Sequence, residues 1–131
     1  DMVTRGSGTV VTVSSMAALT PGLLGGAAYS AAKGAAHNIM RSMNSELRSK
    51  GIRACTVFPG EVDTPILEGR PLPPPAEARA LMMQPEDVAA AILLCAGMPH
   101  RTHVQEIVLT PTQPRDMTEE LRVAAEQKTV V

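Results

Sequence analysis

The chain has 131 residues, a formal net charge of −1 and 44% hydrophobic residues. This length suits one domain or part of one, and the apolar content is high enough for a buried core, which excludes a disordered chain. The near-neutral charge, with no basic run, excludes the electrostatic signature of a nucleic-acid or anionic-membrane partner.

The two cysteines, Cys55 and Cys95, are too few for a disulfide scaffold. Each falls in an apolar segment, so buried free thiols are expected, as in a reducing compartment. The first residues lack the apolar stretch of a signal peptide, and no apolar run approaches the roughly 18 residues that a membrane span needs. We therefore expect a cytoplasmic protein with no membrane partner.

Strands and helices alternate along the chain. Runs of β-branched residues predict strands, and periodic Ala, Leu and Met predict helices. Pro85 suits the first turn of its helix, and Thr118 is the expected N-cap of the last one. The predicted elements are strand 9–15, loop 16–27, helix 28–49, strand 52–58, irregular 61–83, helix 84–98, strand 104–110 and helix 117–127. This order implies parallel strands with right-handed crossovers, hence an α/β layered fold.

Candidate site residues follow the carboxyl ends of two of these strands, where ligands bind in such sheets. Ser14 and Ser15 end the first strand, Pro59–Gly60 ends the second, and Tyr29 and Lys33 lie one helical turn apart. A nearby ammonium favours the phenolate form of tyrosine, so Tyr29 could exchange a proton with a substrate oxygen. Protonating a carbonyl oxygen while hydride reaches its carbon is ketone reduction, and the hydride must come from a cofactor.

Each feature also has an ordinary explanation. Pairs of Tyr and Lys at this spacing are common by chance, serines often satisfy strand ends, and Pro-Gly often forms a simple turn. His37, His100 and His103 lack the spacing of metal ligands, so no metal site is expected and the histidines are interpreted as structural or solvated. A serine hydrolase is disfavoured because no Gly-x-Ser-x-Gly elbow occurs.

Taken together, three ordered motifs resemble the short-chain dehydrogenase/reductase family: "GTVVTVSSMAA", "YSAAK" and "VFPGEVDTPI", within a similarity from about Gly6 to Thr112. The resemblance implies an NAD(P)-dependent oxidoreductase that interconverts a small carbonyl compound and its alcohol. It implies that Ser15 binds the substrate oxygen, Tyr29 is the general acid/base and Lys33 holds the nicotinamide ribose. The family's Pro-Gly-x-Val-x-Thr segment falls on Pro59, Gly60, Val62 and Thr64, which would contact the cofactor.

Two features depart from the family pattern. The Ser15–Tyr29 spacing is one residue longer than usual, which keeps Ser14 as an alternative. The ending "EIVLTPT" is similar to the branch of serine and 3-hydroxy acid dehydrogenases, which act with NADP, so NADP is favoured slightly over NAD. Segment 65–83 resembles the family's substrate loop, where an arginine could bind a carboxylate, although a solvated charge is the preferred interpretation.

The sequence holds no Gly-x-x-x-Gly-x-Gly turn after a strand. By resemblance it corresponds to the C-terminal half of a family domain: 1–116 as part of a doubly wound, Rossmann-like parallel sheet, containing its last three strands, and 117–131 as a helical tail. We expect these residues alone neither to bind dinucleotide tightly nor to turn over substrate. The complete protein is expected to form a homodimer or homotetramer. The alternative is a non-catalytic, scaffold-like relative that docks onto full-length subunits.

Overall fold

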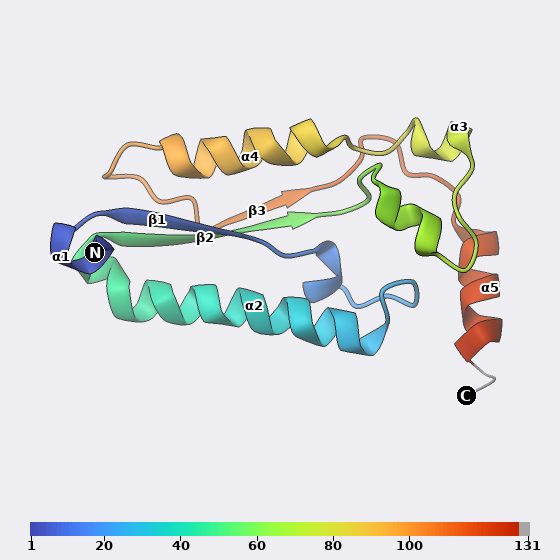
Figure 1. The fold of residues 1–131 in the computed structure, drawn as a ribbon, viewed down its shortest axis with the longest axis horizontal. Coiled ribbons are helices and arrows are strands. Elements are labelled where there is room, and N and C mark those ends of the chain that lie inside the picture. Colours follow the sequence, from blue (N-terminus) through green and yellow to red (C-terminus); the bar gives the residue numbers. More distant parts are fainter. Residues whose placement is uncertain (129–131) are drawn as a thin grey trace.

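A three-stranded parallel sheet forms the centre of the molecule in the computed structural model, which describes residues 1–128. The strand order is β1 (Gly8–Val13), β2 (Ile52–Pro59) and β3 (Glu106–Leu109). Helix α2 (Gly26–Leu47) covers one face of the sheet and α4 (Pro85–Gly97) covers the other (Figure 1). The predicted α/β fold, with parallel strands between flanking helices, is confirmed.

The remaining elements are short, apart from the last helix. They are α1 (Met2–Arg5), η1 (Met16–Ala18), η2 (Arg48–Lys50), η3 (Pro65–Gly69), α3 (Ala76–Arg79) and α5 (Thr118–Lys128). The prediction of an irregular 61–83 segment was therefore wrong in part, because η3 and α3 interrupt it. Proline precedes or opens both turns, which are too short to produce a helical periodicity in the sequence.

The last helix lies apart from the faces of the sheet, beyond the carboxyl ends of the strands (Figure 1). The prediction of Thr118 as the N-cap of this helix was wrong, because Asp116 accepts the hydrogen bonds at the start of the helix. The Asp116 carboxylate is 2.9 Å from the Thr118 backbone N–H nitrogen and 2.6 Å from the Thr118 hydroxyl. The Asp116 carboxylate, two residues before Thr118, accepts from the first backbone N–H of the helix and also fits the positive end of the helix dipole.

The core lies between β2 and the two covering helices. All eight residues of β2 are buried, because it is the central strand and both its faces are covered. Cys55 and Cys95 are buried as free thiols, as predicted. Burial, followed by the neighbouring Cys95, raises the pKa of the Cys55 thiol to about 11. This thiol is therefore a packing group, since the reactive thiolate is strongly disfavoured there.

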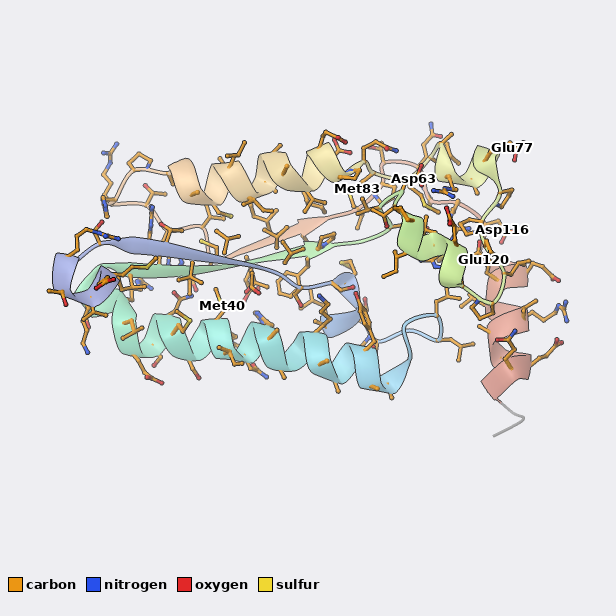
Figure 2. All side chains as sticks on the ribbon, in the orientation of Figure 1. Met40, Asp63, Glu77, Met83, Asp116 and Glu120 are labelled. Carbon is orange, nitrogen blue, oxygen red and sulfur yellow. The ribbon has the colours of Figure 1, made fainter. Side chains whose placement is uncertain are left out.

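Helix α2 turns one face toward the sheet and the other toward solvent. Met40 points at the sheet and is 5% exposed (Figure 2), whereas its neighbour Ile39 is 61% exposed. Gly51, at φ 79°, ends the turn after α2 and feeds the chain into β2. None of the helices in the described part of the chain has the length and apolar character that a membrane crossing requires.

Candidate functional site

The two serines after β1 have different environments. Ser14 is buried, and its hydroxyl donates to the Lys33 carbonyl oxygen at 2.9 Å. Ser15 is half-buried, and its hydroxyl oxygen accepts a bond from the Ala17 backbone N–H at 3.1 Å. The proton of the Ser15 hydroxyl can still donate to another oxygen, while that of Ser14 is committed to the helix. This difference favours Ser15 over Ser14 as the group that would meet a substrate.

Tyr29 and Lys33 lie near the start of α2, beside the end of β1. Lys33 Nζ donates to the Val13 carbonyl oxygen at 3.2 Å and lies 5.8 Å from the centre of the Tyr29 ring. Tyr29 is 42% exposed, so its phenol is accessible. The Ser14 hydroxyl after β1 donates to the backbone of the helix, and the Lys33 ammonium on the helix donates to the backbone of β1. These two hydrogen bonds hold the strand end and the helix together.

Gly25 provides the space in which the Tyr29 ring lies. A Cβ at Gly25 would be 3.1 Å from Tyr29 Cδ1 and 3.7 Å from the Ala17 Cβ. Ala17 is the residue whose N–H bonds to Ser15, so the ring and the serine turn share a small neighbourhood. The close packing of η1 on α2 thus depends on small side chains at this point.

Gly25→Ala should therefore move the Tyr29 ring without unfolding the chain, because Gly25 already has helical φ and ψ of −75° and −38°. Tyr29 is the only tyrosine and the chain has no tryptophan, so the tyrosine band of the near-UV circular dichroism spectrum and the tyrosine fluorescence report on this ring, separately from Phe58. We expect both signals to change while the melting midpoint stays constant. Gly22→Ala, where a Cβ meets nothing within 4 Å, is the control and should change neither. Identical spectra for the two variants would contradict the placement of the ring.

The Pro59–Thr64 segment leaves β2 and is fixed by its backbone. The Gly60 N–H donates to the Leu109 carbonyl oxygen at 2.8 Å. The Glu61 carbonyl oxygen and the Asp63 N–H bond to the backbone of Met83 at 3.1 and 2.8 Å, and Figure 2 shows Asp63 and Met83 at this end of the sheet. In this parallel bridge the peptide groups of Val62 itself point away from Met83. Pro59 is buried in the strand, while Gly60, Val62 and Thr64 are half-buried.

Charged residues in and around the segment form ion pairs that the sequence did not indicate. Arg79 bonds to the Asp63 carboxylate at 2.6 Å, and Arg70 bonds to Glu61 at 3.0 Å. The interpretation of these loop arginines as solvated charges was therefore wrong. The only available signal was the presence of four acidic and two basic residues in 61–79, which does not specify partners.

The histidines occupy structural positions. His37 is buried and contacts the edge of the Phe58 ring at a centroid distance of 4.8 Å. Its two ring nitrogens lie 3.3 Å from the Thr56 hydroxyl oxygen and 3.4 Å from a Glu106 carboxylate oxygen, so it connects α2 to β2 and β3. Among residues 1–128, His, Cys, Asp and Glu side chains nowhere group in threes that could hold a metal ion.

Known proteins resemble this chain in sequence and in fold. Residues 1–72 match the family model of short chain dehydrogenases. An uncharacterized oxidoreductase of Staphylococcus epidermidis is 29% identical over 110 residues, covering 84% of this chain and 45% of that protein. Escherichia coli serine dehydrogenase shares the fold, with a TM-score of 0.69 at 23% identity, over 87% of this chain and 45% of that one.

A metagenomic short-chain oxidoreductase solved in complex with NADP is also similar, with a TM-score of 0.63 and 26% identity. The alignment covers 86% of this chain and 42% of that one. The chain thus spans less than half the length of each of these three relatives. Its family match extends over more than half of the chain, from β1 through the Tyr29–Lys33 helix to the Pro59–Thr64 segment. The chain belongs to the short-chain dehydrogenase/reductase family.

Proposed function

We propose that this chain carries the proton-transfer and nicotinamide-facing part of an NAD(P)-dependent oxidoreductase site, which interconverts a small carbonyl compound and its alcohol. The observation that carries the proposal is the position of Lys33, whose ammonium lies over the Tyr29 ring and is anchored to the Val13 carbonyl. In this proposal Tyr29 gives its phenolic proton to the carbonyl oxygen during reduction and takes it back during alcohol oxidation. The Ser15 hydroxyl donates a hydrogen bond to that same oxygen.

The residues present suit the nicotinamide end of a dinucleotide. Lys33 uses one of its three ammonium protons on Val13, which leaves donors for ribose hydroxyls. The peptide groups of Val62 point away from Met83 and are suited to a carboxamide, with Thr64 two residues further on. The cofactor supplies the hydride when bound. NADP remains slightly favoured over NAD, supported by the NADP complex of the metagenomic relative.

The described part of loop 65–83 also bears on the substrate. Both of its arginines are engaged: Arg70 bonds to Glu61 and Glu120, and Arg79 bonds to Asp63. A substrate carboxylate would have to displace an internal partner to reach either guanidinium. This favours an uncharged carbonyl compound or alcohol over a carboxylate-bearing one as the ligand of the loop.

Titration with reduced nicotinamide mononucleotide tests the proposal on this chain directly, because this ligand lacks the adenosine half of the cofactor. We expect saturable NMR shifts at the amides of Tyr29, Lys33, Val62 and Thr64, with a dissociation constant on the order of 1 mM. AMP, the other half of the dinucleotide, is the matched ligand control, and it should not shift these amides. Lys33→Met is the matched variant, and the mononucleotide should not shift its amides. Equal shifts with both ligands, or none with the mononucleotide, would contradict the proposal and favour a non-catalytic role.

A further inference from the structure

Helix α5 meets the rest of the molecule through a buried charged residue. Its inward face carries Glu120, Val123 and Ala124, and Glu120 is only 6% exposed. Figure 2 shows Glu120 where α5 approaches the η3 segment, away from both faces of the sheet. A buried carboxylate is costly unless it is paired, so its partners should decide how α5 is held.

Those partners form a four-residue network, Glu61–Arg70–Arg115–Glu120. Arg115 Nε and Nη2 donate to the two Glu61 carboxylate oxygens, each at 2.7 Å. The same guanidinium bonds to both Glu120 oxygens, one of them at 2.9 Å. Arg70 Nη1 completes the network with bonds of 3.0 Å to Glu61 and 3.3 Å to Glu120. Two cations and two anions thus balance each other.

The network is strongly buried at its centre. The Arg115 and Glu120 side chains are 5% and 7% exposed, against 55% for Arg122, which forms ordinary surface pairs on the same helix. Burial alone would raise the pKa of Glu61, but hydrogen bonds from Arg115 and Arg70 outweigh it and hold that pKa below its usual value. Removing one member would leave buried charges unpaired, so the four side chains should act together.

Glu61 connects this network to the candidate site. It lies between Gly60 and Val62, in the segment proposed to face the nicotinamide. The backbone of this segment is held by the end of β3 and by Met83. Arg79 anchors the Asp63 side chain, whereas the Glu61 side chain is linked to α5 through Arg115, which bonds to both Glu61 and Glu120. The position of the segment should therefore depend on whether the last helix is docked.

We propose that Arg115 and Glu120 are positioning residues that couple α5 to segment 60–70 and hold the peptide groups around Val62 in place for the cofactor. The effect on the cofactor rests on the proposed function, but the coupling between α5 and segment 60–70 can be measured without any activity. Under it, helix α5 works as part of the site, and the helix and the segment open and close as one unit.

Hydrogen–deuterium exchange on this chain tests the coupling. Arg115→Met should speed amide exchange by about tenfold or more in residues 60–70 and in α5, while β1 and β2 keep their wild-type rates. Arg122→Met is the matched control: it removes two ion pairs from the exposed face of α5 and should leave residues 60–70 unchanged. If Arg115→Met unfolds the chain, Glu120→Gln replaces it, because the amide keeps the volume and loses the charge.

Faster exchange confined to α5 would overturn the proposal, since the helix would then be a tethered end without influence on the site. Unchanged exchange in 60–70 for both Arg115→Met and Glu120→Gln would overturn it as well. Mononucleotide binding that fails in the wild-type chain would refute the proposed function and leave the exchange result standing. The two ideas can therefore fail separately.

Discussion

Tyr29→Phe should reduce turnover of a small carbonyl substrate by about a thousandfold, the scale on which a positioned general acid or base contributes. The change removes only the phenolic oxygen and keeps the ring that packs beside Gly25 and under the Lys33 ammonium. The measurement needs a polypeptide that supplies a Gly-rich dinucleotide turn ahead of this chain, because these residues include none. NADPH oxidation at saturating cofactor then gives kcat, and the KM for NADPH should stay nearly constant.

Thr20→Val is the control for the loss of a hydroxyl. Thr20 is exposed, and its hydroxyl donates to the Met16 carbonyl oxygen in the turn before α2, outside the proposed site. It should leave kcat unchanged. Retained turnover in Tyr29→Phe would refute the role given to Tyr29, whereas an equal loss in both variants would point to a damaged turn instead of a missing proton donor.

The proposed roles of Ser15 and Tyr29 depend on one local arrangement. The Ser14 hydroxyl bonds to the backbone of α2, and the Lys33 ammonium bonds to the backbone of β1. The strand and the helix therefore cannot slide past each other without breaking a hydrogen bond. Ser15 and Tyr29 are the neighbours of these two anchors that keep accessible polar groups. Hydrogen-bonded anchors beside accessible reactants are what a preorganised site requires, because the reacting groups then need little rearrangement.

The layered fold could be predicted from the sequence because its signals are local. The apolar run 52–58 and the periodic segment 84–98 each indicate their own element, and alternation of such elements implies parallel strands. Because β1 and β2 are parallel, Ser15 and Pro59–Gly60 at their carboxyl ends lie at one edge of the sheet, and Lys33 next to Tyr29 bonds to Val13 at that edge. The chemical roles of these residues stay predictions, supported by a family match over residues 1–72.

The Arg115–Glu61 ion pair could not be predicted because it joins distant parts of the chain. Arg115 bonds to Glu61 across 54 positions, and no spacing rule relates two residues that meet only after the fold forms. The short turns of 61–83 were missed for the opposite reason: η3 and α3 have 5 and 4 residues, too few for a periodic signal. Charge and proline content showed that the segment was unusual without showing its shape.

Arg53 also makes long-range contacts, and its replacement carries the largest expected effect on stability. It is a charged residue in the central strand, only 8% exposed, and the strand prediction gave it no role. Its guanidinium bonds to the Thr9 hydroxyl oxygen on the neighbouring strand at 2.8 Å. It also donates to three backbone carbonyl oxygens after α4, those of Met98, Pro99 and Thr102, at 2.9, 3.0 and 2.7 Å.

Arg53→Met should lower the free energy of unfolding by on the order of 3 kcal/mol, because Met fills the space but leaves those carbonyl oxygens without their donor. Urea unfolding followed by far-UV circular dichroism measures the loss as a lower midpoint at an unchanged slope. Arg101→Met is the matched control, since Arg101 is exposed on the same loop that Arg53 holds. A shared midpoint for the two variants would mean that water replaces Arg53 at little cost. A lower midpoint for Arg53→Met alone would show that this buried cation closes the α4–β3 connection onto the sheet.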